Sequence, residues 1–394
     1  MNNGKKVLLL GNFRPTVAIV RQVSALGYGT VVKRDKGGLG AASRHCNEIW
    51  DSPIHASDPD FPQYLTRFLE QRPDIQIVMP VEEQYVLAIA RNRDTLPADR
   101  TYATPPARIV QTCLDKVAML EVCEKAGIPS APNATVSNIE DLNAAATRIG
   151  FPVVVRPLSS VKPIAGRKAY ITMDEATLKH ELPTWPEGHD SLIVQRFISG
   201  PRYNVDYAAQ NGKTIHAVAT RILRTDASDY TGIDVYGETI PMPDDLWDLT
   251  ERMNAELNYS GPGLIQFMVD HDRNEISFLE LNPRFNGNSS VPAHAGLELV
   301  RLSIDLAENP DREEPLNISQ GGLRHAWSYG DVMGIRKSVQ RGMLPRSQVP
   351  KALAAAIKSA VTADYHIIWS WRDPMPAISQ LGIAFNKLIG RDKD

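Results

Sequence analysis

The sequence contains little cysteine, with three such residues among 394. Cys46, Cys113 and Cys123 are too few for a disulfide framework, and their spacing is not that of a zinc site. Acidic and basic residues nearly balance, at a formal net charge of −3, which excludes the strongly basic composition of a general nucleic-acid binder. We therefore expect reduced thiols and no nucleic-acid partner.

Long apolar runs are also missing. No stretch approaches the roughly 20 apolar residues that a membrane-spanning helix needs, and tight runs such as Val153–Val155 are short. The first six residues lead directly into a strand-like run, without the apolar segment of a secretion signal. These absences predict a soluble, cytoplasmic protein without a membrane partner.

Several familiar catalytic and nucleotide-binding motifs do not occur. The sequence has no G-x-x-x-x-G-K-[ST] phosphate loop, no serine nucleophile elbow and no H-E-x-x-H metal pair. Gly37, Gly38 and Gly40 do not complete the G-x-G-x-x-G dinucleotide fingerprint. A P-loop enzyme is thus disfavoured, and a parallel sheet alone would not justify predicting NAD binding.

The first hundred residues alternate between strand-like and helix-like patterns. The apolar runs Lys5–Leu10, Thr30–Lys33 and Ile75–Met79 are separated by segments with helical apolar spacing. This alternation predicts an open parallel sheet with crossover helices. The run Thr104–Pro106 is a plausible hinge after it.

Strand patterns in the middle of the chain do not alternate regularly with helices, which predicts an α+β arrangement. Leu264–Asp270 and Glu275–Leu281, joined by the polar turn His271–Asn274, form an expected antiparallel hairpin. After Asn309 we expect helices over Pro350–Val361 and Ala377–Ile389. We expect this last part of the chain to pack on the body of the protein or to complete a homodimer; the alternative is that Trp369, Trp371 and the basic end Lys387–Lys393 dock a partner or an acidic surface.

The hairpin carries the most informative residues. Glu280 and Asn282 are two apart on a strand, so their side chains lie on one face and offer the oxygen ligands that Mg²⁺ prefers. Gln266 on the partner strand could meet the same metal. Arg284 follows as a fork-shaped cation suited to a carboxylate or phosphoryl group. The alternative is an ordinary hairpin with a solvated glutamate.

Other cations support the first interpretation. Lys116 begins a predicted helix after Asp115, and Arg156 ends an apolar strand, where burial is costly unless the cation meets an anion. Lys162 and Lys168 lie in a basic loop that contains a glycine. Each of these residues alone is typical of a solvated surface, so their weight comes from occurring together with the hairpin.

These segments together resemble the ATP-grasp superfamily, and most closely its carbamoyl-phosphate-synthetase-like branch of stand-alone carboxylate–amine ligases. The resemblance rests on Asp115-Lys116, Phe151–Pro157, Val194–Gly200 and Glu280–Arg284. It implies an α/β N-terminal open parallel sheet, an α+β ATP-grasp domain of two subdomains and a C-terminal extension. The implied domain bounds are 1–108, 109–190, 191–308 and 309–394.

The resemblance also implies a role for each matching residue. Lys116 and Arg156 would contact ATP phosphates, and the loop containing Lys162 would fold over them. The adenine hinge would be Gln195, Arg196, Phe197 and Ile198. Gln266, Glu280 and Asn282 would hold Mg²⁺, with Mn²⁺ as the alternative, and Arg284 would steady the acyl-phosphate or the substrate carboxylate.

The implied reaction activates a small-molecule carboxylate as an acyl-phosphate and couples it to an amine, giving an amide or peptide, ADP and phosphate. His294 or an acidic residue of Asp226–Asp234 is a candidate general base. Arg196 and Arg202 stand where relatives carry acidic residues, which favours an alternative: a nucleotide-binding regulatory module without turnover. A third interpretation is a phosphoryl-transfer enzyme that needs no amine.

Overall fold

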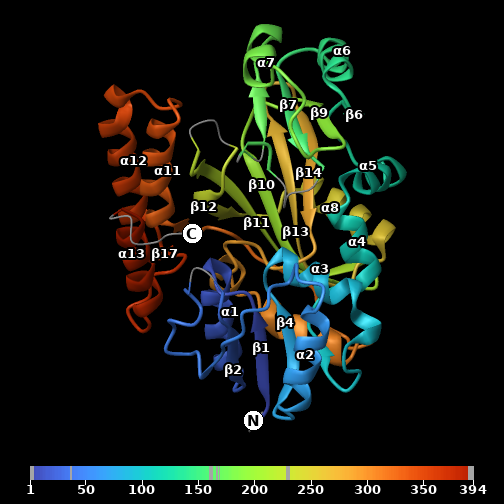
Figure 1. Ribbon diagram of the computed structural model, residues 1–394, viewed down its shortest axis with the longest axis vertical. Helices are drawn as coiled ribbons and strands as arrows, with labels where there is room; N and C mark the ends of the chain where they lie inside the picture. Colours follow the sequence, from blue (N-terminus) through green and yellow to red (C-terminus); the bar gives the residue numbers. More distant parts are fainter. Residues whose placement is uncertain are drawn as a thin grey trace. The chain divides into compact units, whose positions relative to one another are not determined.

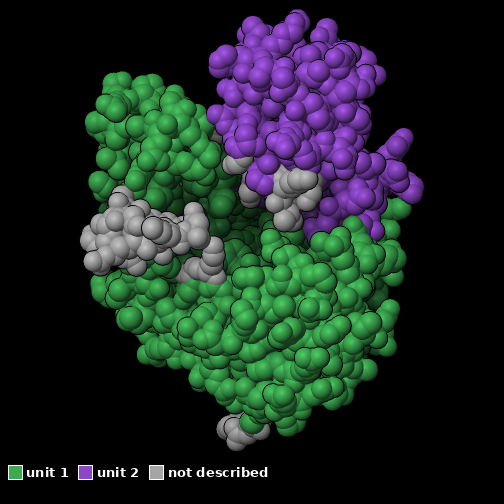
Figure 2. Space-filling view, viewed as in Figure 1, with its two compact units in different colours: residues 1–111, 204–264, 282–394 green, residues 112–203, 265–281 purple. Residues whose placement is uncertain are grey.

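The computed structural model describes most of the chain (Figure 1). The described residues are 4–35, 38–158, 163–165, 167, 169–227 and 231–388, with side chains described up to 383. They divide into two compact units, which Figure 2 colours separately. Unit 1 comprises residues 1–111, 204–264 and 282–394, and unit 2 comprises residues 112–203 and 265–281.

Unit 1 opens with the predicted parallel sheet. Its five strands have the order β3-β2-β1-β4-β5, and all four adjacent pairs are parallel. The three expected strands are present, and the two that the sequence pattern missed, β3 and β5, have only three and two residues. The elements of this region are β1 (Lys6–Leu10), α1 (Arg14–Ala25), β2 (Gly29–Lys33), β3 (Glu48–Trp50), α2 (Phe61–Glu70), β4 (Ile75–Pro80), α3 (Glu83–Arg91), η1 (Arg93–Thr95), β5 (Thr101–Tyr102) and α4 (Ala107–Leu114).

Unit 1 also contains a second, mainly antiparallel group of strands. β10, β11, β12, β16 and β17 follow one another in this order, and β15 pairs with β11. The C-terminal residues therefore contribute short strands to this sheet. The elements are β10 (Arg202–Gln210), β11 (Lys213–Thr225), β12 (Asp234–Ile240), α8 (Asp244–Leu257), α9 (Ser290–His294), α10 (Leu299–Glu308), β15 (Asn317–Ile318), β16 (Arg324–Ala326) and β17 (Tyr365–His366).

The remaining C-terminal elements are helical. α11 (Ser328–Gln340) and α12 (Val349–Thr362) pack side by side, with η2 (Arg346–Gln348) between them in the chain, and α13 (Met375–Leu388) follows (Figure 1). Arg224 at the end of β11 donates to both carboxylate oxygens of Asp331 in α11 and to Ser359 Oγ in α12. This largely buried ion pair ties both helices to the sheet.

Unit 2 is built on a four-stranded sheet with the order β6-β9-β7-β8, antiparallel throughout. The helices α6 and α7 pack with this sheet and with each other, around a core of small and branched apolar side chains. The elements are α5 (Lys116–Lys125), β6 (Asn133–Val136), α6 (Ile139–Ile149), β7 (Val153–Pro157), β8 (Tyr170–Thr172), α7 (Glu175–Glu181) and β9 (Leu192–Arg196). The backbone continues between the units along β13 (Gly261–Asp270) and β14 (Glu275–Asn282).

One core of unit 1 joins residues distant in the sequence. Val7, Leu9 and Ile77 of the parallel sheet pack in one buried cluster with Val218 of β11 and Leu302 of α10. Among the described residues, no helix combines the length and the apolar character needed to cross a bilayer.

Candidate functional site

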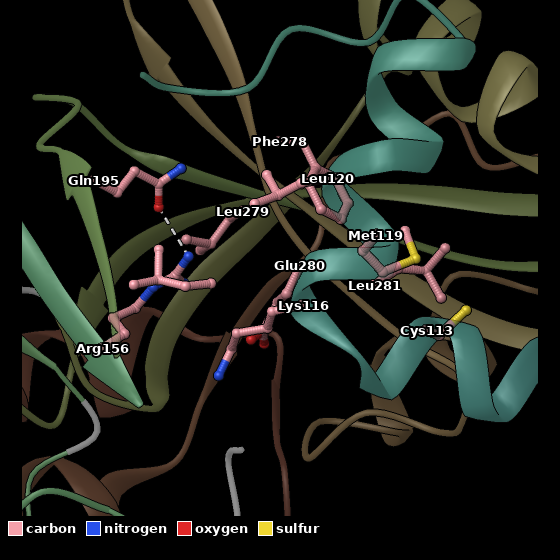
Figure 3. Close-up of a pocket in the computed structure, with 11 residues that line it drawn as sticks. Cys113, Lys116, Met119, Leu120, Arg156, Gln195, Phe278, Leu279, Glu280 and Leu281 are labelled. Atoms are coloured by element: carbon pink, nitrogen blue, oxygen red, sulfur yellow. Dashed lines mark hydrogen bonds between the residues drawn. The ribbon is translucent and has the colours of Figure 1, made fainter. Parts of the chain in front are cut away.

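A pocket in unit 2 brings charged and apolar side chains together (Figure 3). Its charged residues are Lys116, Arg156 and Glu280, which come from α5, β7 and β14. The apolar side chains labelled in Figure 3 come from α4, α5 and β14. Ile193 of β9 completes the apolar lining, which consists of Cys113, Met119, Leu120, Ile193, Phe278, Leu279 and Leu281. The arrangement separates an apolar wall from a charged end.

Arg156 is the cation that the strand pattern predicts, and its side chain is partly buried. Its Nη2 donates to Gln195 Oε1 at 2.8 Å, while its buried Nε has no hydrogen-bond partner among the described residues. Burial lowers the pKa of Arg156, and the charge of Glu280 opposes this shift. The guanidinium therefore lies near one carboxylate and retains donor capacity at the charged end of the pocket.

Lys116 is the first residue of α5. Asp115 caps this helix, because its carboxylate accepts from Val117 N at 2.9 Å and Ala118 N at 3.1 Å. The Lys116 ammonium donates to the carbonyl oxygens of Pro157 at 2.7 Å and Leu158 at 3.0 Å. These bonds fix the ammonium at the end of β7, beside the position of Arg156.

The segment after β9 presents backbone groups. Arg196 N and Phe197 N both donate to backbone carbonyls, those of Pro132 and Pro152, at 2.9 Å each. The N–H of Ile198 makes no backbone bond to a described residue. The Arg196 guanidinium forms an ion pair with Glu275 of β14, so this arginine has a counter-ion within unit 2.

The proposed metal residues belong to the two strands that run between the units. Gln266 on β13 and Glu280 on β14 lie in unit 2, whereas Asn282 and Arg284 lie in unit 1. In unit 1, Arg284 Nη2 donates to Asn282 Oδ1 at 3.2 Å and to Glu83 Oε2 at 3.3 Å. The buried Nε of Arg284 has no partner in the described part of the chain.

Comparison with known proteins identifies these motifs. Residues 189–327 match a family model described as "ATP-grasp in the biosynthetic pathway with Ter operon". This part of the chain is an ATP-grasp domain. The matched residues include the segment from Gln195 to Ile198 and the whole of β13 and β14.

The curated relatives are much longer than the region they share with this chain. The chain is 24% identical over 282 residues to the methylcrotonoyl-CoA carboxylase subunit alpha of Glycine max, covering 67% of this chain and 37% of that protein. It is 30% identical over 183 residues to the carbamoyl phosphate synthase large chain of Lachnoclostridium phytofermentans. This match covers 45% of this chain and 17% of that protein. The chain thus spans well under half of either relative.

Solved structures share the fold. The ADP complex of N5-carboxyaminoimidazole ribonucleotide synthetase has a TM-score of 0.64 at 14% identity and covers 86% of this chain and 85% of its own. A second structure is the biotin carboxylase domain of the Hydrogenobacter thermophilus 2-oxoglutarate carboxylase, in complex with MgADP and bicarbonate. It has a TM-score of 0.63 at 17% identity, and the match covers 79% of this chain and 71% of that one. The predicted fold class is confirmed.

The structure brings several predicted residues together and leaves others apart. Lys116, Arg156, Gln195 and Glu280 line one pocket. The loop residues Lys162 and Lys168 lie outside the described residues. His294 ends α9, where its ring stacks on Tyr365 with centroids 3.9 Å apart.

The apolar wall of the pocket was not among the predicted site residues. Met119 and Leu120 are three and four residues beyond Lys116, one helical turn away on α5. This spacing is the signal that the sequence offers, because residues three and four positions after Lys116 lie on the same side of the helix.

Proposed function

We propose that this protein is an ATP-dependent carboxylate–amine ligase that uses Mg²⁺, with Mn²⁺ as the alternative ion. The observation that carries the proposal is the meeting of Arg156, Lys116 and Glu280 in a pocket whose remaining lining, apart from Gln195, is apolar. An apolar wall suits a planar base, and clustered cations beside a carboxylate suit phosphates with a divalent ion.

The nucleotide would be held by residues of unit 2. Arg156 and Lys116 would contact the phosphates, and Lys162 would do so from the neighbouring loop. Gln195, Arg196, Phe197 and Ile198 would form the adenine hinge. Within it, the N–H of Ile198 is the group best suited to the base edge, because those of Arg196 and Phe197 already donate to carbonyls.

The donor chemistry fits a magnesium ion. Glu280 supplies one carboxylate, and Gln266 and Asn282 supply amide oxygens, so the set is hard and carries a single negative charge. Among the described residues, no three His, Cys, Asp or Glu side chains gather into a metal cluster. A set of this kind therefore depends on phosphate oxygens to complete the metal shell. When bound, Mg²⁺ would neutralise charge that develops between the β- and γ-phosphates.

The chain's own residues would then position the reactants. The substrate carboxylate attacks the γ-phosphorus, giving an acyl-phosphate and ADP, and an amine displaces phosphate to give the amide. Arg284 would steady the acyl-phosphate through its planar donor fork, whose Nε has no partner among the described residues. Glu83 and Asn282 accept from its Nη2, and Phe285 O accepts from its Nη1, so these bonds orient the guanidinium.

A release assay tests the proposal. The full chain is mixed with ATP, Mg²⁺, pooled carboxylic acids and pooled amines, and ADP is measured. We expect ADP release that requires an acid, and product formation that requires an amine. Release that is unaffected by every acid would overturn the ligase assignment.

The second candidate is a regulatory module that binds nucleotide without turnover. It was favoured by Arg196, which stands where relatives carry an acidic residue. Because Glu275 pairs with the Arg196 guanidinium, this side chain has a partner other than the nucleotide. Nucleotide binding by calorimetry, without ADP release under any substrate mixture, would favour this candidate over the ligase.

A further inference from the structure

Arg14, the first residue of α1, is a buried cation without a counter-ion in the described part of unit 1. Only 8% of its surface is exposed, and its Nη1 has no hydrogen-bond partner among the described residues. The guanidinium lies over the Trp327 ring, with its carbon 4.0 Å from the ring centroid. Stacking holds the group in place, but it leaves the buried Nη1 without an acceptor among the described residues.

The electrostatic cost of this arrangement points to a missing anion. Burial lowers the pKa of Arg14 to about 10, so the side chain remains charged at neutral pH. The charge of Asp226 favours the cation but does not offset the effect of burial. A buried guanidinium is expensive unless an anion compensates it, and arginine is the side chain best suited to bind one in two-pronged fashion.

The guanidinium of Arg14 packs closely against the backbone at Gly287. A Cβ at this position would lie 2.2 Å from Arg14 Nη2, so the guanidinium can occupy its place only beside a glycine. Ser289 Oγ donates to Pro15 O at 3.0 Å and anchors the same loop to the start of α1. Two loops that are distant in sequence therefore converge on this one side chain.

Asn12 adds a second unused donor. Its side chain is fully buried, and its Oδ1 accepts from Ala41 N at 2.8 Å, which fixes the amide. The Nδ2 has no partner among the described residues. Both residues follow β1, which lies between β2 and β4, and so they occupy the switch point where open parallel sheets bind ligands. The twelve-residue helix α1 begins here and directs its positive end to the same place.

We propose that Arg14, Asn12 and the N-terminus of α1 bind an anionic group, a carboxylate or a phosphate, of one of the ligase's substrates. That the ligand is a substrate rests on the proposed function. Because Arg284 is assigned to the carboxylate that is activated, Arg14 would take an additional acid group. The substrate class is therefore an acid with a second anionic group.

Trp327 also lines a cavity of about 390 Å³ in unit 1, together with Tyr329 and Met333. Arg14 does not line this cavity itself but stacks on Trp327, which does. Arg336 and Lys337 contribute two further cations to the lining, against one carboxylate from Asp226. The cavity is in the size range of small-molecule sites, and its charge favours an anion.

Calorimetric titration without nucleotide tests this site. The full chain is titrated with succinate and with inorganic phosphate at constant ionic strength, using wild type, Arg14→Met, Arg14→Lys and Arg93→Met. Arg93 is the matched control, because it lies 4.2 Å from the Tyr102 ring and is outside the proposed site. We expect wild type and Arg93→Met to bind at least one probe equally. Arg14→Met should bind more than tenfold more weakly, and Arg14→Lys should be intermediate.

The two probes separate the sources of the anion. Binding of succinate alone assigns a carboxylate, and binding of phosphate alone assigns a phosphate group. No binding of either probe to wild type, or equal binding by Arg14→Lys and wild type, would overturn the proposal, even if Arg14→Met failed to fold. Thermal unfolding adds an independent readout, since ligand-free Arg14→Met should be at least as stable as wild type. Anion binding without ADP release would retain this site while contradicting the ligase assignment.

Discussion

At the residue scale, a few partly buried charged side chains form the centre of the candidate site. Arg156 and Glu280 lie in the same pocket, and each moderates the cost of burying the other. A pair of this kind is weak support for stability, because desolvation offsets much of its attraction. Its presence in a pocket beside Lys116 is better explained by a charged ligand.

Replacing Glu280 with glutamine should abolish turnover while the protein stays folded. Glu280 is the only carboxylate in the proposed metal set, and an amide cannot supply its charge next to triphosphate oxygens. We expect ADP release to fall more than roughly 100-fold, or about 3 kcal/mol of transition-state stabilisation. Exposed Glu140→Gln in α6 is the control and should keep wild-type release. Near-wild-type release by folded Glu280→Gln would remove this residue from the mechanism.

Replacing Arg156 with alanine should weaken ATP binding by about tenfold or more, since a charge-assisted hydrogen bond contributes roughly 1.5–3 kcal/mol. Calorimetry with ATP and Mg²⁺ measures the change. The exposed Arg148→Ala variant at the end of α6 controls for net charge and should bind as wild type does. Unchanged ATP affinity in Arg156→Ala would make this arginine a structural partner of Gln195 and Glu280.

The buried Asp206 predicts a pH dependence of stability. Burial raises the pKa of Asp206 to about 8, although a hydrogen bond from Asn286 opposes this shift; the ordinary pKa of the group is 3.8. Between pH 3.8 and pH 8 the folded state therefore keeps a proton on Asp206 that the unfolded state has lost. The free energy of unfolding falls as the pH rises through this range. From pH 6 to 8 we expect a loss of about 2 kcal/mol in wild type.

Asp206→Asn should lack this dependence, because an amide does not titrate. Urea unfolding at pH 6, 7 and 8 measures it, with the exposed Asp311→Asn as a control that retains the wild-type slope. The same slope in Asp206→Asn and wild type would show that another group is responsible.

At the element scale, the C-terminal residues were the hardest part to predict. The helices expected near 350–361 and 377–389 exist as α12 and α13. The strands β16 and β17 have three and two residues, too few for any alternating pattern to appear. α11 contains two glycines, and Gly334 is required because a Cβ there would lie 2.4 Å from Asp226 O. Its packing therefore overrides its low helix propensity.

The attachment of these helices can be tested through Asp331. This carboxylate is buried and pairs with Arg224, which also donates to Ser359 Oγ at 2.7 Å. Asp331→Ala would leave the arginine without its counter-ion, so we expect unfolding free energy to fall by about 3 kcal/mol. Asp248→Ala, which removes an exposed pair within α8, should cost less than about 0.5 kcal/mol. Equal effects of the two variants in urea unfolding would contradict this account of how the helices are held.

At the scale of the whole molecule, the sequence was most informative where chemistry fixes residue types at fixed spacing. The segment from Glu280 to Arg284 pointed to the ATP-grasp superfamily, and the alternation of the first hundred residues predicted the parallel sheet. The joining of that sheet with Val218 and Leu302 in one core could not be predicted, because it depends on contacts between distant parts of the chain. The burial of Arg14 was equally hidden, since no local pattern marks a buried arginine at a helix start. The domain bounds at 108, 190 and 308 stay predictions.

The central claim is that the protein activates a carboxylate as an acyl-phosphate, and trapping with hydroxylamine tests it most directly. Hydroxylamine replaces the amine substrate in a reaction with ATP, Mg²⁺ and pooled carboxylic acids, and the hydroxamate is measured together with ADP. We expect acid-dependent hydroxamate and ADP in equal amounts from wild type, and neither from Glu280→Gln. ADP release without hydroxamate, or hydroxamate formation that survives in Glu280→Gln, would contradict the account.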